Sequence, residues 1–247
     1  PGSRLEKNLN GGEKYYHLIL LVKNETGWKN LLKLVTASYL EGFYYKPRMD
    51  KELLGKYHEG LIALSGCLAG EVSRNLMAKR PDEAEKAARE YQSIFGAENF
   101  YLEIGHHPGI KETIQVGEDL IALSHKTGIP LVATQDIHYL KKEDAYYHDI
   151  LLAVQTGNKL DDPDRLTLKN DDFSMRSPEE MAELFKNTPE AITNTVKIAE
   201  ACSITLELDK IRIPKFNTPE GYTATTYLRK LLEDRLKWRY PEPSTEV

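Results

Sequence analysis

The chain has 247 residues, enough for one large α/β domain or two small ones. Its 33 Lys and Arg against 38 Asp and Glu leave a net charge of −5, which argues against a dedicated DNA-coating surface but not against binding one phosphate at a metal. No apolar run reaches the length of a membrane span, and two distant cysteines make no disulfide framework, so a reducing, cytoplasmic compartment is the simpler interpretation.

The first two-thirds of the sequence alternate between strand and helix patterns. Strands are predicted at 15–23, 61–64, 100–104 and 129–134. Helices are predicted at 26–39, on both sides of Pro81, at 112–127 and at 142–155. Such alternation is typical of an α/β fold with a parallel sheet or barrel and helices outside. Four strands cannot close a barrel, so either strands are missing or the sheet is open.

The character of the sequence changes after Thr156. A polar loop is predicted at 158–174, and Ser177 to Glu180 form a capping box with proline at the first helical position. A second helix is predicted from Thr188 to Cys202, a short strand at 204–208 and a last helix at 223–240. We therefore predict a barrel portion at 1–156 and a mostly helical extension at 157–247.

Asp136 and His138 follow the predicted strand 129–134 directly. Two residues apart in an extended segment, their side chains would point the same way. A carboxylate and an imidazole at the carboxyl end of a strand suit half of a divalent-metal site. The alternative is a solvated aspartate beside a capping or core histidine.

Other candidate ligands have weaker local signals. Cys67 lies just past a strand, where a thiolate could bind a metal, although cysteine also serves as a small core hydrophobe. His17 lies within an apolar strand and is either a ligand or a hydrogen-bonded core histidine. His106 and His107 follow the strand that carries Glu103, so at most one of these two histidines would face the same edge as that carboxylate. Cys202 is assigned to packing.

Several ordered strings resemble one family, the PHP domain at the N-terminus of bacterial DNA polymerase III alpha subunits. They are Tyr16-His17-Leu18-Ile19-Leu20-Leu21-Val22-Lys23-Asn24-Glu25-Thr26-Gly27, Glu41-Gly42-Phe43-Tyr44-Tyr45-Lys46-Pro47-Arg48, Gly60-Leu61-Ile62-Ala63-Leu64-Ser65-Gly66-Cys67-Leu68-Ala69-Gly70, Val132-Ala133-Thr134-Gln135-Asp136-Ile137-His138-Tyr139-Leu140, Leu160-Asp161-Asp162-Pro163 and Ser177-Pro178-Glu179-Glu180-Met181. The resemblance runs almost from end to end.

This resemblance implies a distorted, PHP-type β/α barrel with a multinuclear divalent-metal site. His17, Cys67, Asp136 and His138 fall on the family's ligand pattern, and their side chains are expected within about 8 Å of one point. The thiol favours zinc, with manganese as the alternative. Gln135 stands where the family usually has asparagine, whereas the next residue, Asp136, is the expected ligand.

For function, the resemblance implies part of a DNA-directed DNA polymerase, a nucleotidyltransferase with DNA and other replicase subunits as partners. The PHP site would then act as a 3′–5′ exonuclease or phosphoesterase, or support the polymerase structurally. The family's first His-x-His motif and the polymerase carboxylates are expected outside this chain, so the isolated piece is expected to be inactive. The alternative is a stand-alone PHP phosphoesterase of the histidinol phosphatase type.

One point conflicts with a wholly parallel arrangement. His17 lies near the start of its predicted strand, whereas Cys67 and Asp136 follow theirs. In parallel strands, His17 would lie at the opposite edge. Either its strand runs antiparallel to the neighbouring one, or the strand begins later than the pattern predicts.

Overall fold

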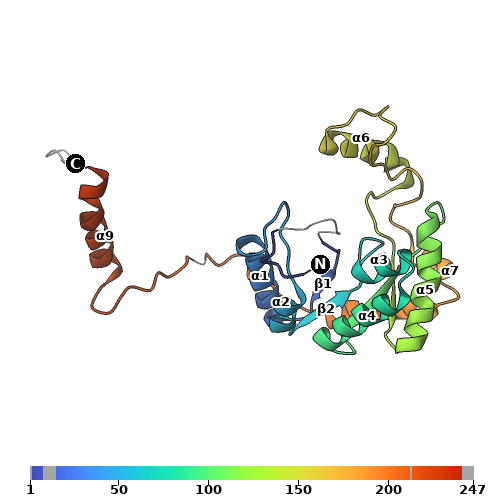
Figure 1. Cartoon of the computed structure of the whole chain (residues 1–247), viewed down its shortest axis with the longest axis horizontal. Coiled ribbons are helices and arrows are strands. Elements are labelled where there is room, and N and C mark those ends of the chain that lie inside the picture. The colour runs from blue at the N-terminus through green and yellow to red at the C-terminus, as the bar shows by residue number, and fades with distance from the viewer. Residues whose placement is uncertain (1, 8–14, 212, 241–247) are drawn as a thin grey trace. The chain divides into compact units, whose positions relative to one another are not determined.

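A computed structural model describes residues 2–7, 15–211 and 213–240 of the chain (Figure 1). The chain divides into two compact units, Pro1–Thr205 and Leu206–Val247, which are considered separately. The predicted division after residue 156 lies within the first unit, because a helix beyond it packs on the sheet. The assignment of residues 157–247 as a mostly helical extension of a barrel portion stays a prediction.

The first unit contains a four-stranded sheet in the order β1-β2-β3-β4. Its strands are β1 (Ile19–Val22), β2 (Leu61–Leu64), β3 (Phe100–Gly105) and β4 (Leu131–Thr134). Strands β2, β3 and β4 run parallel, and β1 runs antiparallel to β2, with Ile19 opposite Leu64. The α/β class is confirmed. In the part of the chain that the structure describes, these strands form an open sheet and do not close a barrel.

Helices connect and cover the strands. They are α1 (Glu25–Leu40), α2 (Lys51–Lys56), α3 (Glu71–Met77), α4 (Pro81–Phe95), α5 (Lys111–Thr127), the 3-10 turn η1 (Lys142–Asp144), α6 (Ala145–Thr156), α7 (Pro178–Leu184) and α8 (Pro189–Ala201). The Ser177 capping box is present, with both reciprocal hydrogen bonds. In the second unit, α9 (Ala224–Arg239) confirms the predicted last helix, whereas the strand predicted at 204–208 is wrong, because those residues form no strand.

Both faces of the sheet are covered by apolar side chains. On one face, Leu102 and Ile104 of β3 belong to a core shared with helices α3, α4 and α5. On the other, Tyr101 and Val132 pack with Ile198 of α8. Cys202, just after α8, packs against this second cluster, as predicted. Strands buried on both sides explain why their sequences are apolar without alternation.

The polar loop after α6 is tied back to that helix. Asp149 of α6 is 1% exposed and accepts hydrogen bonds from both terminal nitrogens of Arg165, at 2.7 and 2.6 Å, and from the Thr167 hydroxyl at 2.7 Å. Lys169 Nζ lies 2.6 Å from the same carboxylate. The Arg165 hydrogen bonds, with those of Lys169 and Thr167, hold the pKa of Asp149 far below its usual range. This buried carboxylate is fully partnered.

Within residues 2–7, 15–211 and 213–240, no helix has the length and apolar character needed to cross a membrane.

Candidate metal centre

The antiparallel direction of β1 resolves the conflict over His17. The start of β1 lies beside the carboxyl end of β2, and the His17 N–H donates to Ala69 O at 3.0 Å. His17 also forms a bridge with Gly70, so it contacts the loop that carries Cys67. Both explanations offered by the sequence are therefore correct. The strand runs antiparallel to β2, and it begins later than predicted, at Ile19.

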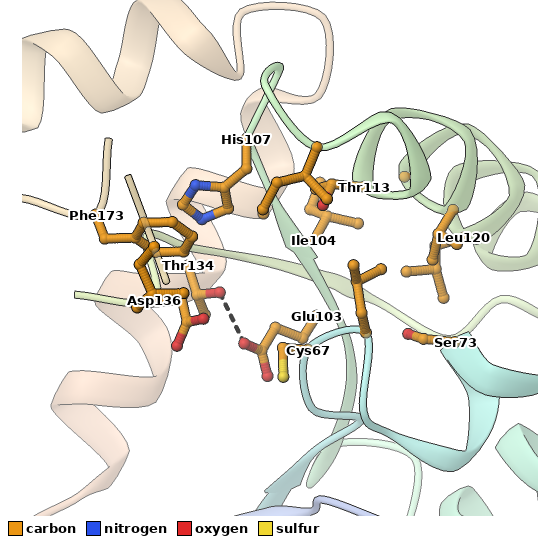
Figure 2. A pocket seen from close by; sticks show the side chains of 16 residues that line it. Cys67, Ser73, Glu103, Ile104, His107, Thr113, Leu120, Thr134, Asp136 and Phe173 are labelled. Atoms are coloured by element: carbon orange, nitrogen blue, oxygen red, sulfur yellow. Dashed lines mark hydrogen bonds between the residues drawn. The ribbon is translucent and has the colours of Figure 1, made fainter. Parts of the chain in front are cut away.

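A cavity of about 180 Å³ opens where β2, β3 and β4 end. Figure 2 shows Cys67, Glu103 and Asp136 at its polar end, while His107 stacks on Phe173 on the same side of the cavity. The other walls come mainly from apolar side chains of β3 and α5. Residues from three strand ends thus meet where parallel sheets commonly bind ligands.

Asp136 has an unusual backbone conformation. Its φ of 49° lies in the left-handed region, which aspartate tolerates better than most residues and which often marks functional sites. The extended segment assumed for Asp136 and His138 is therefore wrong, since β4 ends at Thr134. The two side chains still meet: His138 Nε2 lies 3.5 Å from Asp136 Oδ1. The His138 backbone N–H donates to Phe173 O at 3.0 Å, which fixes the segment.

Cys67 is a free, half-buried cysteine. Burial raises the pKa of its thiol, and the nearby carboxylates of Asp136 and Glu103 raise it further. The thiol therefore keeps its proton at neutral pH until a cation compensates the negative charge.

Glu103 is 6% exposed and lies between the ends of two strands. Its Oε1 accepts from the Thr134 hydroxyl at 2.8 Å, whereas Oε2 is buried without a hydrogen-bond partner among the described residues. Burial raises the pKa of this carboxyl group, and Asp136 adds to the effect.

His107 is also buried, at 5% exposure, and neither ring nitrogen has a hydrogen-bond partner among the described residues. Its ring stacks on the ring of Phe173, with ring centroids 4.3 Å apart, and its Nδ1 lies 3.9 Å from Asp171 Oδ1. Burial lowers the pKa of His107, which favours the neutral imidazole. His106 instead packs edge-on against Phe185, so one histidine of the pair lines the cavity.

The structure thus gives the four sequence-predicted ligands different positions. Cys67 and Asp136 line the same cavity, His138 adjoins Asp136, and His17 contacts the Cys67 loop through its backbone while lining a neighbouring cavity. As the side chains lie, no three His, Cys, Asp or Glu residues within the described ranges are arranged to hold one ion. Convergence of all four around a metal stays a prediction.

Sequence reasoning missed Phe173, because no motif marks this residue in the loop after α6. It also gave no role to Thr134, which binds Glu103. The useful signal was Glu103 itself, a carboxylate inside an apolar strand, where a charge needs a partner.

Strand ends that carry a thiol, two carboxylates and an imidazole around one cavity are features of a metal-dependent α/β domain. Residues 3–107 match the PHP domain family. The chain is 43% identical over its whole length to the DNA polymerase III subunit alpha of Treponema pallidum, and 45% identical over 98% of its length to that of Thermus aquaticus. The chain is therefore similar over nearly its whole length to a stretch of DNA polymerase III alpha subunits, and its residues 3–107 carry the match to the PHP domain. It spans about a fifth of the length of these relatives.

Proposed function

We propose that this chain supplies part of the divalent-metal site of a PHP domain within a bacterial replicative DNA polymerase III alpha subunit. The observation that carries the proposal is the cavity at the ends of β2, β3 and β4, which Cys67 and Asp136 line together with the buried Glu103. The relatives support the assignment to a DNA-directed DNA polymerase, with DNA and other replicase subunits as partners in the cytoplasm.

The donor chemistry of the cavity suits a divalent ion. A thiol beside carboxylates and an imidazole favours zinc over manganese. His17, Cys67, Asp136 and His138 would hold the ion, with a change of side-chain conformation, since as they lie no three donors in the described ranges converge. Asp136 has room for such a change because its side chain is 46% exposed.

A bound divalent ion supplies polarisation of a phosphoryl oxygen and activation of a water molecule. The residues of this chain would set its position and keep one side of the cavity apolar. We propose phosphoester hydrolysis, as a 3′–5′ exonuclease or a related phosphoesterase, with structural support of the polymerase as the alternative role. A stand-alone enzyme of the histidinol phosphatase type is disfavoured, because the similarity to polymerase subunits extends over 98–100% of the chain.

The test measures metal content and 3′-end cleavage for the full chain, expressed with any flanking sequence that its gene encodes. Asp136→Asn and Cys67→Ser should each lower bound zinc at least about tenfold. The matched control Asp164→Asn changes an exposed aspartate outside the cavity and should leave metal content unchanged. Loss of cleavage together with metal supports hydrolysis, and metal binding without any cleavage supports the structural role. Equal metal content in all three variants would refute the proposed site.

A further inference from the structure

Glu103 is held by its neighbours in a way that leaves one oxygen facing the cavity. Its backbone N–H donates to Ser65 Oγ at 2.9 Å, and its Oε1 accepts from Thr134 Oγ1 at 2.8 Å. These two contacts tie Glu103 to the ends of β2 and β4, the strands that lead to Cys67 and Asp136. The second oxygen, Oε2, has no hydrogen-bond partner within the described residues (Figure 2).

The chain shows elsewhere how it accommodates a buried carboxylate that serves structure alone. Asp149 is surrounded by Arg165, Lys169 and Thr167, which occupy both of its oxygens. Glu103 is nearly as buried, but only hydrogen bonds from the Thr134 hydroxyl and the Gly66 backbone stabilise its charge, and the one charged group that acts on it is the carboxylate of Asp136. A buried carboxylate is stable only when a cation or hydrogen-bond donors compensate its charge.

We propose that Glu103 is a further metal ligand of this site, with Oε2 as the donor atom, beside Cys67 and Asp136. This inference rests on the proposed metal site and adds a ligand from the middle strand, which the sequence pattern does not assign. A divalent cation between the three side chains would satisfy Oε2 and would stabilise the negative charge that these side chains carry as ligands. The rigid Glu103 would set the position of the ion, while the more exposed Asp136 closes onto it.

The experiment uses cobalt(II) as a spectroscopic substitute for zinc, titrated into the full chain with any flanking sequence that its gene encodes. Thiolate ligation gives a charge-transfer band in the near ultraviolet, and the visible d–d bands report the number and kind of ligands. Glu103→Gln keeps the size of the side chain and its ability to accept from Thr134, so folding is retained. Glu112→Gln, at an exposed position in the first turn of α5, is the matched control.

The expected result is that Glu103→Gln weakens cobalt binding at least about tenfold and changes the d–d bands, whereas Glu112→Gln does neither. Weaker binding with unchanged bands would show a positioning role and overturn direct ligation. Unchanged affinity and bands in Glu103→Gln would also overturn it, while leaving the proposed metal site standing. No cobalt binding by the parent chain would refute the metal site and Glu103 ligation together. A thermal melt in chelator checks that both variants fold like the parent.

Discussion

The contact between α8 and the sheet makes a quantitative prediction about Ile198. This side chain is 6% exposed and packs in a small cluster with Ile62, Leu64, Tyr101 and Val132. Ile198→Ala removes three carbon atoms, worth about 0.8 kcal/mol each in transfer free energy, before any cavity penalty. Because the cluster is small and Cys202 borders it, partial relaxation is expected. The free energy of unfolding should therefore fall by about 2–3 kcal/mol.

The assay is urea unfolding in the presence of chelator, so that metal binding does not contribute. The midpoint should fall without a change in the denaturant slope, because the same surface is exposed on unfolding. Val196→Ala, on the exposed side of the same helix, is the matched control and should change stability by less than about 0.5 kcal/mol. Equal effects of the two substitutions would refute the packing of α8 on the sheet and favour a unit that ends near residue 156.

Two further predictions concern buried ionisable groups. Asp149→Asn should release the loop after α6, because Arg165 loses its charged partner. Proteolysis within residues 158–174 should then become faster. The control Asp164→Asn, at an exposed position of the same loop, should leave the rate of proteolysis unchanged. Burial keeps the pKa of His107 below its ordinary value of 6.5 in the folded state, so its contribution to stability is present above pH 6.5 and is lost as the pH falls from 6.5 through the folded-state pKa. In thermal melts at a series of pH values, His107→Leu should reduce the decrease in stability toward acid pH. The control His125→Leu, at an exposed position, should leave that decrease unchanged.

The strand and helix pattern could be predicted because most elements carry their own signals. Apolar runs such as 61–64 and 100–104 have the length of a strand and end at or near a glycine, which favours a buried strand over a helix, and both form buried strands in the structure. The strand at 204–208 failed because alternation of apolar residues describes only a propensity. A strand also needs a neighbour, and none pairs with these residues in the part of the chain that the structure describes.

The candidate site could be predicted only in part. Cys67 and Asp136 were candidates because they follow strands, whose ends can be read from the sequence, but only the family resemblance favoured them as ligands. The left-handed backbone conformation of Asp136 could not be predicted, because aspartate adopts many conformations and only tertiary contacts select one of them. Phe173 reaches the cavity from a loop 37 positions beyond Asp136, and no periodic pattern specifies such a contact.

The close approach between His17, just before β1, and the Cys67 loop gives a last prediction, at Gly66. This residue has φ of 81°, and a Cβ added there would lie 2.9 Å from His17 O, a backbone atom that cannot rotate away. Gly66→Ala therefore combines left-handed strain with a clash, whereas Gly128→Ala, at φ of 73° with nothing within 4 Å of the added Cβ, carries the strain alone.

Both substitutions should lower stability by about 1–2 kcal/mol through backbone strain, and Gly66→Ala should lower it by about 1 kcal/mol more. The clash would also move His17 away from the loop that positions Cys67. Cobalt binding should then weaken in Gly66→Ala and stay unchanged in Gly128→Ala. If the two variants lose the same stability and bind cobalt equally well, His17 and Cys67 are not coupled through this contact. In that case the antiparallel β1 would have no part in assembling the site.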